Sequence, residues 1–297
     1  MSLFSLLGAL EIGLIFSLVA LGVFISFRLL RFPDLTVDGS FPLGGAVCAT
    51  LIASGTDPFS ATIIATFAGA AAGLVTGWLN VKLKIMDLLA SILMMIALYS
   101  VNLRIMGKPN VPLITEPTVF TILQPGWISD YVARPLILIV IVILAKLALD
   151  WFFATQTGLA VRATGSNGRM ARAQGVNTGR MILGGMALSN ALVALAGALF
   201  AQTQGGSDIS MGIGTIVIGL AAVIVGESIL PSRKLVLATL AVIIGAIVYR
   251  FFIALALNSD FIGLKAQDLN LVTAVLVTVA LVIPMLKRRL VLSLIHI

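Results

Sequence analysis

Apolar runs of about 20 residues recur along the chain and alternate with short polar segments. A helix needs about 20 apolar residues to cross the hydrocarbon of a bilayer, whereas the strands of a membrane β-barrel alternate over about ten residues. The runs fall near residues 7–27, 39–55, 59–81, 87–106, 134–153, 182–203, 211–230, 235–257 and 268–286. The pattern predicts an all-α polytopic membrane protein with about nine transmembrane helices, within a range of eight to ten.

The second run is the weakest, because it opens with Asp38, Gly39 and Pro42. Proline lacks the N–H that a helix interior needs, and irregular backbone at membrane depth is tolerated only inside protein or beside water. This segment is therefore either a crossing helix or a broken, re-entrant one.

Composition supports the membrane class and narrows the chemistry. Hydrophobic residues make up 60% of the 297 positions and charged residues 10%, which excludes a soluble globular domain. In such a chain the net charge of +7 records topology rather than nucleic-acid binding. One cysteine, Cys48, excludes an internal disulfide, and one histidine, His296, excludes a His-based metal site or a Ser-His-Asp triad. We expect no metal site and no catalytic cluster, and the sequence has no phosphate-binding GxxxxGKS/T loop.

Basic residues indicate the orientation. Groups of Lys and Arg follow the first, third, fifth, seventh and ninth runs, and the positive-inside rule assigns them to the cytoplasm. The N-terminus is then expected outside and the C-terminus inside. The residues concerned are Arg28, Arg31, Lys82, Lys84, Arg162, Arg169, Arg172, Arg180, Arg233, Lys234, Lys287, Arg288 and Arg289.

Residues 1–289 are expected to form one transmembrane domain. Segment 107–133, which carries four prolines, predicts a structured extracytoplasmic loop with room for a short surface helix. Residues 290–297 are expected to be a tail foreign to the domain, since LSLIHI is what a sequencing-library transposon end spells in one reading frame.

The segment 155–181 is a polar, Arg-containing region between two apolar runs. Gly158 and Gly165 punctuate it, and Ser166 and Asn167 are good N-caps for a short helix over 168–174. Gly175 stands where a left-handed C-terminal cap belongs. The predicted helix lies parallel to the membrane with Arg169 and Arg172 one turn apart on its polar face, as a contact for something outside the bilayer.

Small residues and isolated charges mark the apolar runs. The third run repeats a small residue at every fourth position, in Ala65, Gly69, Gly73 and Gly77, which predicts close helix packing. The sixth has a similar stripe in Asn190, Ala194, Gly197 and Ala201.

Three charged positions within the runs, or at their ends, need an explanation. Lys146 and Asp150 are one turn apart and are expected to neutralise each other, and Glu11 is expected near the outer interface. Glu227, toward a cytoplasmic end, is either functional or a contact for water or a basic neighbour.

The polar region resembles the cytoplasmic coupling segment of permeases from the branched-chain amino acid and ribose type of ABC importer. Segments DGSFPLGGA (38–46) and IGLAAVIVGES (218–228) are similar to two further Gly-rich parts of that family. The subset paired with tryptophan or tyrosine types of solute-binding protein looks closest, while Glu227, Ser228 and Asp38 depart from the branched-chain members. The matched coupling positions are Thr157, Gly158, Ala160, Arg162, Ala163, Asn167, Ala171, Gly175, Val176 and Asn177.

The resemblance implies a non-catalytic permease subunit in the bacterial inner membrane, importing an amino acid-like solute. Its implied partners are an ATPase that holds ATP and Mg, an extracytoplasmic solute-binding protein, a second permease copy and membrane lipid. Candidate residues of the translocation path are Met94, Met95, Ser189, Asn190, Thr215 and Glu227. The alternative is a stand-alone secondary carrier for a small polar solute, although a buried series of Asp, Glu and His residues for proton coupling is missing from the sequence.

Overall fold

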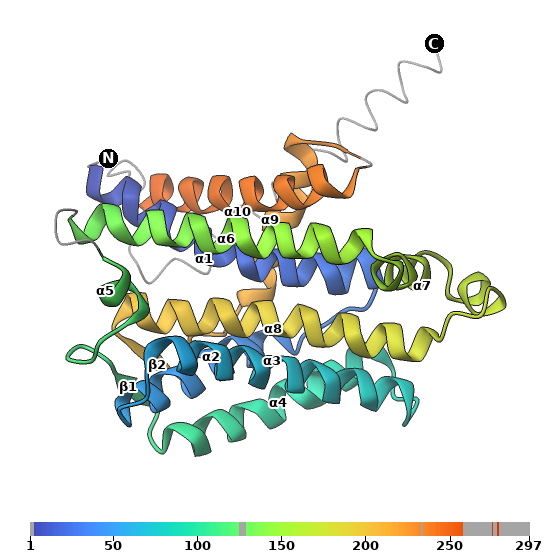
Figure 1. The fold of residues 1–297 in the computed structure, drawn as a ribbon, viewed down its shortest axis with the longest axis horizontal. Coiled ribbons are helices and arrows are strands. Elements are labelled where there is room, and N and C mark those ends of the chain that lie inside the picture. Colours follow the sequence, from blue (N-terminus) through green and yellow to red (C-terminus); the bar gives the residue numbers. More distant parts are fainter. Residues whose placement is uncertain (1–2, 125–128, 233, 258–274, 276–277, 279–297) are drawn as a thin grey trace, which may run out of the picture.

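The structure is a computed structural model and describes residues 3–124, 129–232, 234–257, 275 and 278. Nearly all of this part is helical (Figure 1). Its helices are α1 Leu3–Val23, the π-helix η1 Phe24–Leu30, α2 Val37–Ala53, α3 Pro58–Val81, α4 Asp87–Met106, α5 Val119–Leu123, α6 Asp130–Ala154, α7 Gln156–Ala173, α8 Thr178–Gln204, α9 Thr215–Ile229 and α10 Leu235–Leu257. Two three-residue strands, β1 Asn110–Pro112 and β2 Gly206–Asp208, pair antiparallel with Val111 opposite Ser207.

The all-α membrane class is confirmed. Within the described residues, six helices are long and apolar enough to cross a membrane, and α2 and α9 are shorter apolar helices. These eight elements fall on the first eight predicted runs. Of the ninth run, 268–286, the structure describes residues 275 and 278 alone, and the tail 290–297 lies outside the described residues.

The span formed by α1 and η1 is the centre of the bundle. In its most apolar window 78% of residues are buried, against 22% in α4 and in α6, which therefore lie at the periphery. Figure 1 shows α6 and α10 on one side of α1, while α8, then α2 and α3, and finally α4 follow on the other side. Phe16 of α1, Phe41 of α2 and Phe200 of α8 pack their rings together where these three helices meet.

Small residues let α3 and α2 approach α8 closely. A Cβ built at Gly73 would lie 2.2 Å from the carbonyl oxygen of Met186, and one at Gly69 would lie 2.5 Å from that of Asn190. Gly197 of α8 is equally close to the carbonyl oxygen of Phe41, at 1.9 Å. Ala65 is fully buried in the same region, and a Cβ at Gly77 would lie 3.3 Å from Leu183, a looser but still tight contact. Close approach of this kind replaces the hydrophobic driving force that is absent between helices in lipid.

The second span is a continuous helix that starts inside the bundle. Residues 31–36 are non-helical, and α2 then runs through Pro42 without a break. The prediction for 211–230 was too long, because α9 begins only at Thr215, after turns over 209–214. At 1.5 Å per residue, α2 and α9 are roughly 25 Å and 22 Å long, short of the hydrocarbon thickness of about 30 Å.

The two ends of the bundle differ in charge. Val81 packs against Gly179, so the turn holding Lys82 and Lys84 lies beside the start of α8. Arg28, Arg31 and Arg162 surround one cavity at this end. Figure 1 shows β1, β2 and α5 at the opposite end from α7. This gathering of basic groups agrees with the predicted cytoplasmic face; the orientation itself stays a prediction.

Candidate functional site

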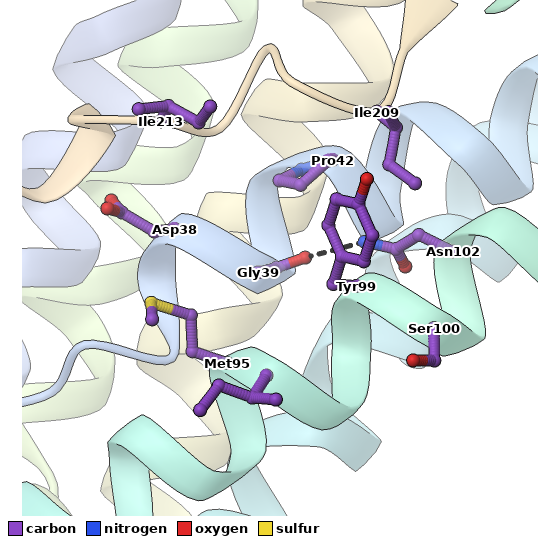
Figure 2. Close-up of a pocket in the computed structure, with 10 residues that line it drawn as sticks. Asp38, Gly39, Pro42, Met95, Tyr99, Ser100, Asn102, Ile209 and Ile213 are labelled. Atoms are coloured by element: carbon purple, nitrogen blue, oxygen red, sulfur yellow. Dashed lines mark hydrogen bonds between the residues drawn. The ribbon is translucent and has the colours of Figure 1, made fainter. Parts of the chain in front are cut away.

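An apolar cavity of about 420 Å³ opens between α2, α4 and the loop that precedes α9. It lies at the point in the bundle where α2 and α9 begin. Figure 2 shows that its lining residues come from these three segments. The lining residues are Asp38, Gly39, Pro42, Met95, Ile96, Tyr99, Ser100, Asn102, Ile209 and Ile213.

Asp38 joins the beginnings of the two short helices. Its carboxylate accepts the backbone N–H of Ile216 at 2.8 Å and that of Gly214 at 3.3 Å, in the first turn of α9. The carboxylate thus satisfies donors that a helix N-terminus leaves unpaired, and the helix dipole in turn favours the ionised carboxylate. The other ends of the two helices diverge, since α2 runs toward β1 and β2, and Glu227 of α9 pairs with Arg28 of η1.

Asn102 contributes a polar group that the sequence analysis missed. Its Nδ2 donates to the carbonyl oxygen of Gly39 at 3.1 Å, the bond drawn in Figure 2. Its Oδ1 is buried and has no hydrogen-bond partner among the described residues, which is uncommon for a buried amide. The signal available in the sequence was an amide inside an otherwise apolar run, 87–106.

A second polar group at this depth surrounds Asn190 of α8. Its Nδ2 donates to the buried carboxylate of Asp34 at 2.8 Å, and its Oδ1 accepts the hydroxyl of Ser40 at 2.6 Å. Ser189 donates to the carbonyl oxygen of Gly22 at 2.7 Å. These bonds join α1, the segment 31–36 and α2 to α8. Asp34 was not predicted from the sequence, where its signal was a carboxylate in the polar break before the second run.

The structure brings only part of the predicted translocation path together. Met95 lines the cavity, and the buried Thr215 lies at the start of α9 between the two amides that Asp38 accepts. Met94 packs against the cluster around Leu43 and is not among the lining residues. Ser189 and Asn190 lie in helix contacts away from this cavity.

Glu227 lies elsewhere, at the far end of α9, where Arg28 donates to its carboxylate at 2.6 Å. Of the two roles expected for Glu227, the structure thus shows the contact with a basic neighbour. The predicted Lys146 to Asp150 pair is confirmed, and Asp150 also accepts the hydroxyl of Thr239 on α10 at 2.8 Å.

The predicted coupling segment contains more helix than expected. The first part of α7 continues from Gln156 to a kink at Asn167, where φ is −152° and ψ is 90°. The second part is the predicted short helix, and Asn167 caps it by accepting the N–H of Met170 at 3.1 Å. Gly175 has a φ of +83°, which confirms the predicted left-handed residue after the helix.

Gly158 and Gly165 do not interrupt α7, contrary to the expectation. Both lie within the helix and are buried or half-buried at close contacts, since a Cβ at Gly158 would lie 2.2 Å from the carbonyl oxygen of Phe152. At Gly165 the corresponding distance to the carbonyl oxygen of Leu29 is 1.8 Å. The glycines therefore allow the first part of α7 to pack against α6 and η1.

The remaining matched positions divide by exposure. Gly158 and Ala171 are buried, and Ala160, Arg162 and Val176 are half-buried. Arg172 donates to the hydroxyl of Thr178 at 3.2 Å, which connects the second part of α7 to the start of α8. The exposed members are Thr157, Ala163, Asn167, Arg169, Arg172, Gly175 and Asn177.

Comparison with known proteins identifies the family of this chain. Residues 5–286 match the model of a family described as branched-chain amino acid transport system / permease component. The chain is 40% identical to a tyrosine transport system permease protein of Clostridioides difficile over 265 residues, which cover 89% of this chain and 86% of that protein. No solved structure matches.

Two further relatives extend the comparison. The chain is 34% identical to an uncharacterized protein of Rickettsia prowazekii, covering 93% of this chain and 96% of that one. It is 27% identical to a ribose import permease protein of Escherichia coli, covering 86% and 78%. The chain therefore belongs to the branched-chain amino acid and ribose permease family of ABC importers, as a multi-pass transport subunit of the bacterial inner membrane.

Proposed function

We propose that this chain forms the translocation path for an amino acid-like solute and is driven by a separate ATPase that docks on α7. The observation that carries the proposal is the division of α7 at Asn167. The first part packs against η1 through Gly165, while the second part presents Arg169 and Arg172 to solvent and is capped at both ends. A capped helix resists fraying when a partner pulls on it.

A continuous series of contacts leads from α7 to the cavity. Gly165 meets the backbone of η1 at Leu29, and the neighbouring Leu30 packs on Gly185 of α8 at 2.5 Å from the position of a Cβ. The next residues include Asp34, whose carboxylate binds Asn190 of α8. The chain then enters α2, whose Asp38 binds the start of α9. Movement of α7 would thereby reach the cavity through packed, hydrogen-bonded elements, as alternating access between two arrangements requires.

The partners in this proposal are those of the importer class. An ATPase holding ATP and Mg docks at the basic end, a solute-binding protein delivers solute at the end that carries β1, β2 and α5, and a second permease copy completes the path within the lipid. The basic end supports an acidic partner surface, because Arg28, Arg31 and Arg162 surround a cavity of about 420 Å³ there.

An amino acid-like solute is favoured over a sugar. The relative that is 40% identical is a tyrosine transport system permease protein, whereas the ribose import permease protein is 27% identical. The mostly apolar lining of the cavity between α2, α4 and the loop before α9 also favours an amino acid with an apolar side chain over a sugar.

The test is uptake by proteoliposomes that contain the full chain, with and without an ATPase and a solute-binding protein of the importer class from the same organism. We expect uptake of radiolabelled tyrosine only when both partners, ATP and Mg are present. ATP-independent uptake by the chain alone, driven by an ion gradient, would instead establish the secondary-carrier alternative and overturn the proposal.

A further inference from the structure

We propose that the cavity between α2, α4 and the loop before α9 is a solute subsite that selects a protonated amine carrying an apolar or aromatic side chain. Asp38 would accept hydrogen bonds from the ammonium group, and the apolar lining would hold the side chain. This subsite rests on the proposed transport function and gives the permease itself a part in selecting the solute.

The carboxylate of Asp38 has acceptor capacity to spare. Two carboxylate oxygens offer about four acceptor positions, and the backbone N–H groups of Gly214 and Ile216 occupy two of them. These contacts come from a helix N-terminus, which stabilises the negative charge, and they hold the side chain in one orientation. The cavity therefore presents a fixed anionic group, which is suited to a cation.

Asn102 is a second, independent residue of this cavity whose amide oxygen lacks a hydrogen-bond donor among the described residues. The residue is fully buried, its Nδ2 is occupied by the carbonyl oxygen of Gly39, and its Oδ1 has no partner in the described part of the chain. Figure 2 shows that oxygen on the side of the amide away from the Gly39 bond. Buried acceptors are nearly always paired, so a water or a further donor group of the ligand that reaches this oxygen would complete its hydrogen bonding, at a point separate from Asp38.

The rest of the lining fixes the other half of the ligand. Pro42, Met95, Ile96, Tyr99, Ile209 and Ile213 provide an apolar surface around a volume of about 420 Å³. This volume lies within the range of roughly 300–1,000 Å³ that is usual for small-molecule sites. A sugar would leave most of its hydroxyls without partners against such a surface, whereas a hydrophobic amino acid would not.

The test is protection of a reporter thiol in the full-length chain in lipid nanodiscs. Cys48 is the only cysteine and is buried, so Cys48→Ala combined with Ser100→Cys places one thiol at the cavity wall. We would measure the rate of labelling by 2-aminoethyl methanethiosulfonate with L-phenylalanine, 3-phenylpropionate or D-ribose at millimolar concentration. L-Phenylalanine should slow labelling several-fold, and neither 3-phenylpropionate, which lacks the ammonium group, nor ribose should do so. Equal protection by 3-phenylpropionate, or protection by ribose, would overturn the proposal, as would no protection by L-phenylalanine.

Two carboxylate variants in the same background separate recognition from folding. Asp38→Asn should abolish the protection by L-phenylalanine. Asp57→Asn is the matched control, because Asp57 also accepts two N–H groups in the first turn of a helix, from Phe59 and Ser60, but does not line the cavity. Protection by L-phenylalanine that survives Asp38→Asn would refute the role of Asp38 in binding the ammonium group. If that variant does not fold, the comparison of the three ligands on the chain with Cys48→Ala and Ser100→Cys alone still tests the proposal. The assay needs neither ATP nor partners, so protection without ATP-driven uptake would refute the transport proposal alone.

Discussion

Gly165 of α7 lies directly against the carbonyl oxygen of Leu29 in η1, so that a Cβ at Gly165 would be only 1.8 Å from that oxygen. The atoms nearest to that Cβ position belong to the backbone of Leu29 and Leu30, so no flexible side chain could move aside to make room for it. The contact joins the segment assigned to ATPase coupling to the central span of the bundle, and it gives the first test of how α7 acts.

Gly165→Ala should separate α7 from η1 and reduce ATP-driven uptake. Inserting a methyl group into a close backbone contact forces shifts that cost about 1–3 kcal/mol. Gly168→Ala is the control, because nothing lies within 4 Å of a Cβ at Gly168. We expect a large loss of uptake in the proteoliposome assay for Gly165→Ala only. Equal uptake by both variants would show that the α7 to η1 contact does not transmit the motion.

Gly175→Val should uncouple ATP hydrolysis from uptake. Gly175 has a φ of +83°, and a β-branched residue in the left-handed region is strained by roughly 1–2 kcal/mol or more. Gly55→Val matches the strain, since Gly55 has a φ of +87° and also has open space around it, but lies between α2 and α3. Stimulation of ATPase activity by the loaded binding protein is the measurement. Normal stimulation in Gly175→Val, or the same defect in Gly55→Val, would contradict a specific role of this cap in coupling.

The two ion pairs should differ in their contribution to stability. The side chains of Lys146 and Asp150 are 12% and 11% exposed, so Asp150→Ala leaves a buried cation unpaired and should destabilise the chain by about 3–5 kcal/mol. Arg28 and Glu227 are 60% and 36% exposed, and Glu227→Ala should cost about 0–1 kcal/mol. Thermal unfolding of the chain in detergent would compare the variants. Lys146→Met together with Asp150→Leu should restore most of the loss; an unrestored double variant would mean that the packing of α6, rather than charge, was damaged.

Asn190→Ala should destabilise the bundle although it removes few atoms. It would remove one partner of the buried Asp34 carboxylate, which keeps the N–H of Thr36, and the acceptor of the Ser40 hydroxyl, and an unpaired buried polar group costs about 1–3 kcal/mol. Gln204→Ala is a suitable control, because Gln204 is exposed at the end of the same helix. Melting temperatures in the same detergent provide the measurement. Indistinguishable melting temperatures would indicate that water replaces the lost hydrogen bonds.

Local features of the fold could be predicted well from the sequence. The apolar runs located eight helices, and the cap residues Asn167 and Gly175 located the short helix of α7, because both depend on residues near one another in the chain. The start of α9 and the role of Gly158 and Gly165 were missed. Each depends on a backbone segment that is distant in the sequence. A turn inside an apolar run has the same composition as a helix there, and a glycine at a packing contact cannot be told in the sequence from a glycine that ends a helix.

The candidate site was predictable only in fragments. Asp38 and Met95 were singled out for separate reasons, and Asn102 and Asp34 were not singled out at all. A polar residue in or beside an apolar run can be recognised in the sequence, but its hydrogen-bond partner cannot. Asp38, for example, accepts the N–H of Ile216, which is 178 positions away.

The sequence by itself determined the class of protein, the family and the capping of the segment that we propose contacts the ATPase, since length, hydrophobicity and capping are properties of consecutive residues. Only the tertiary structure decided that α2 and α9 begin beside each other and that one cavity brings together Asp38, Asn102 and an apolar surface. The physical reason is packing: close contacts of backbone with backbone, at Gly69, Gly73 and Gly197 against α8 and α2, set which helices adjoin, and that arrangement decides which polar groups meet.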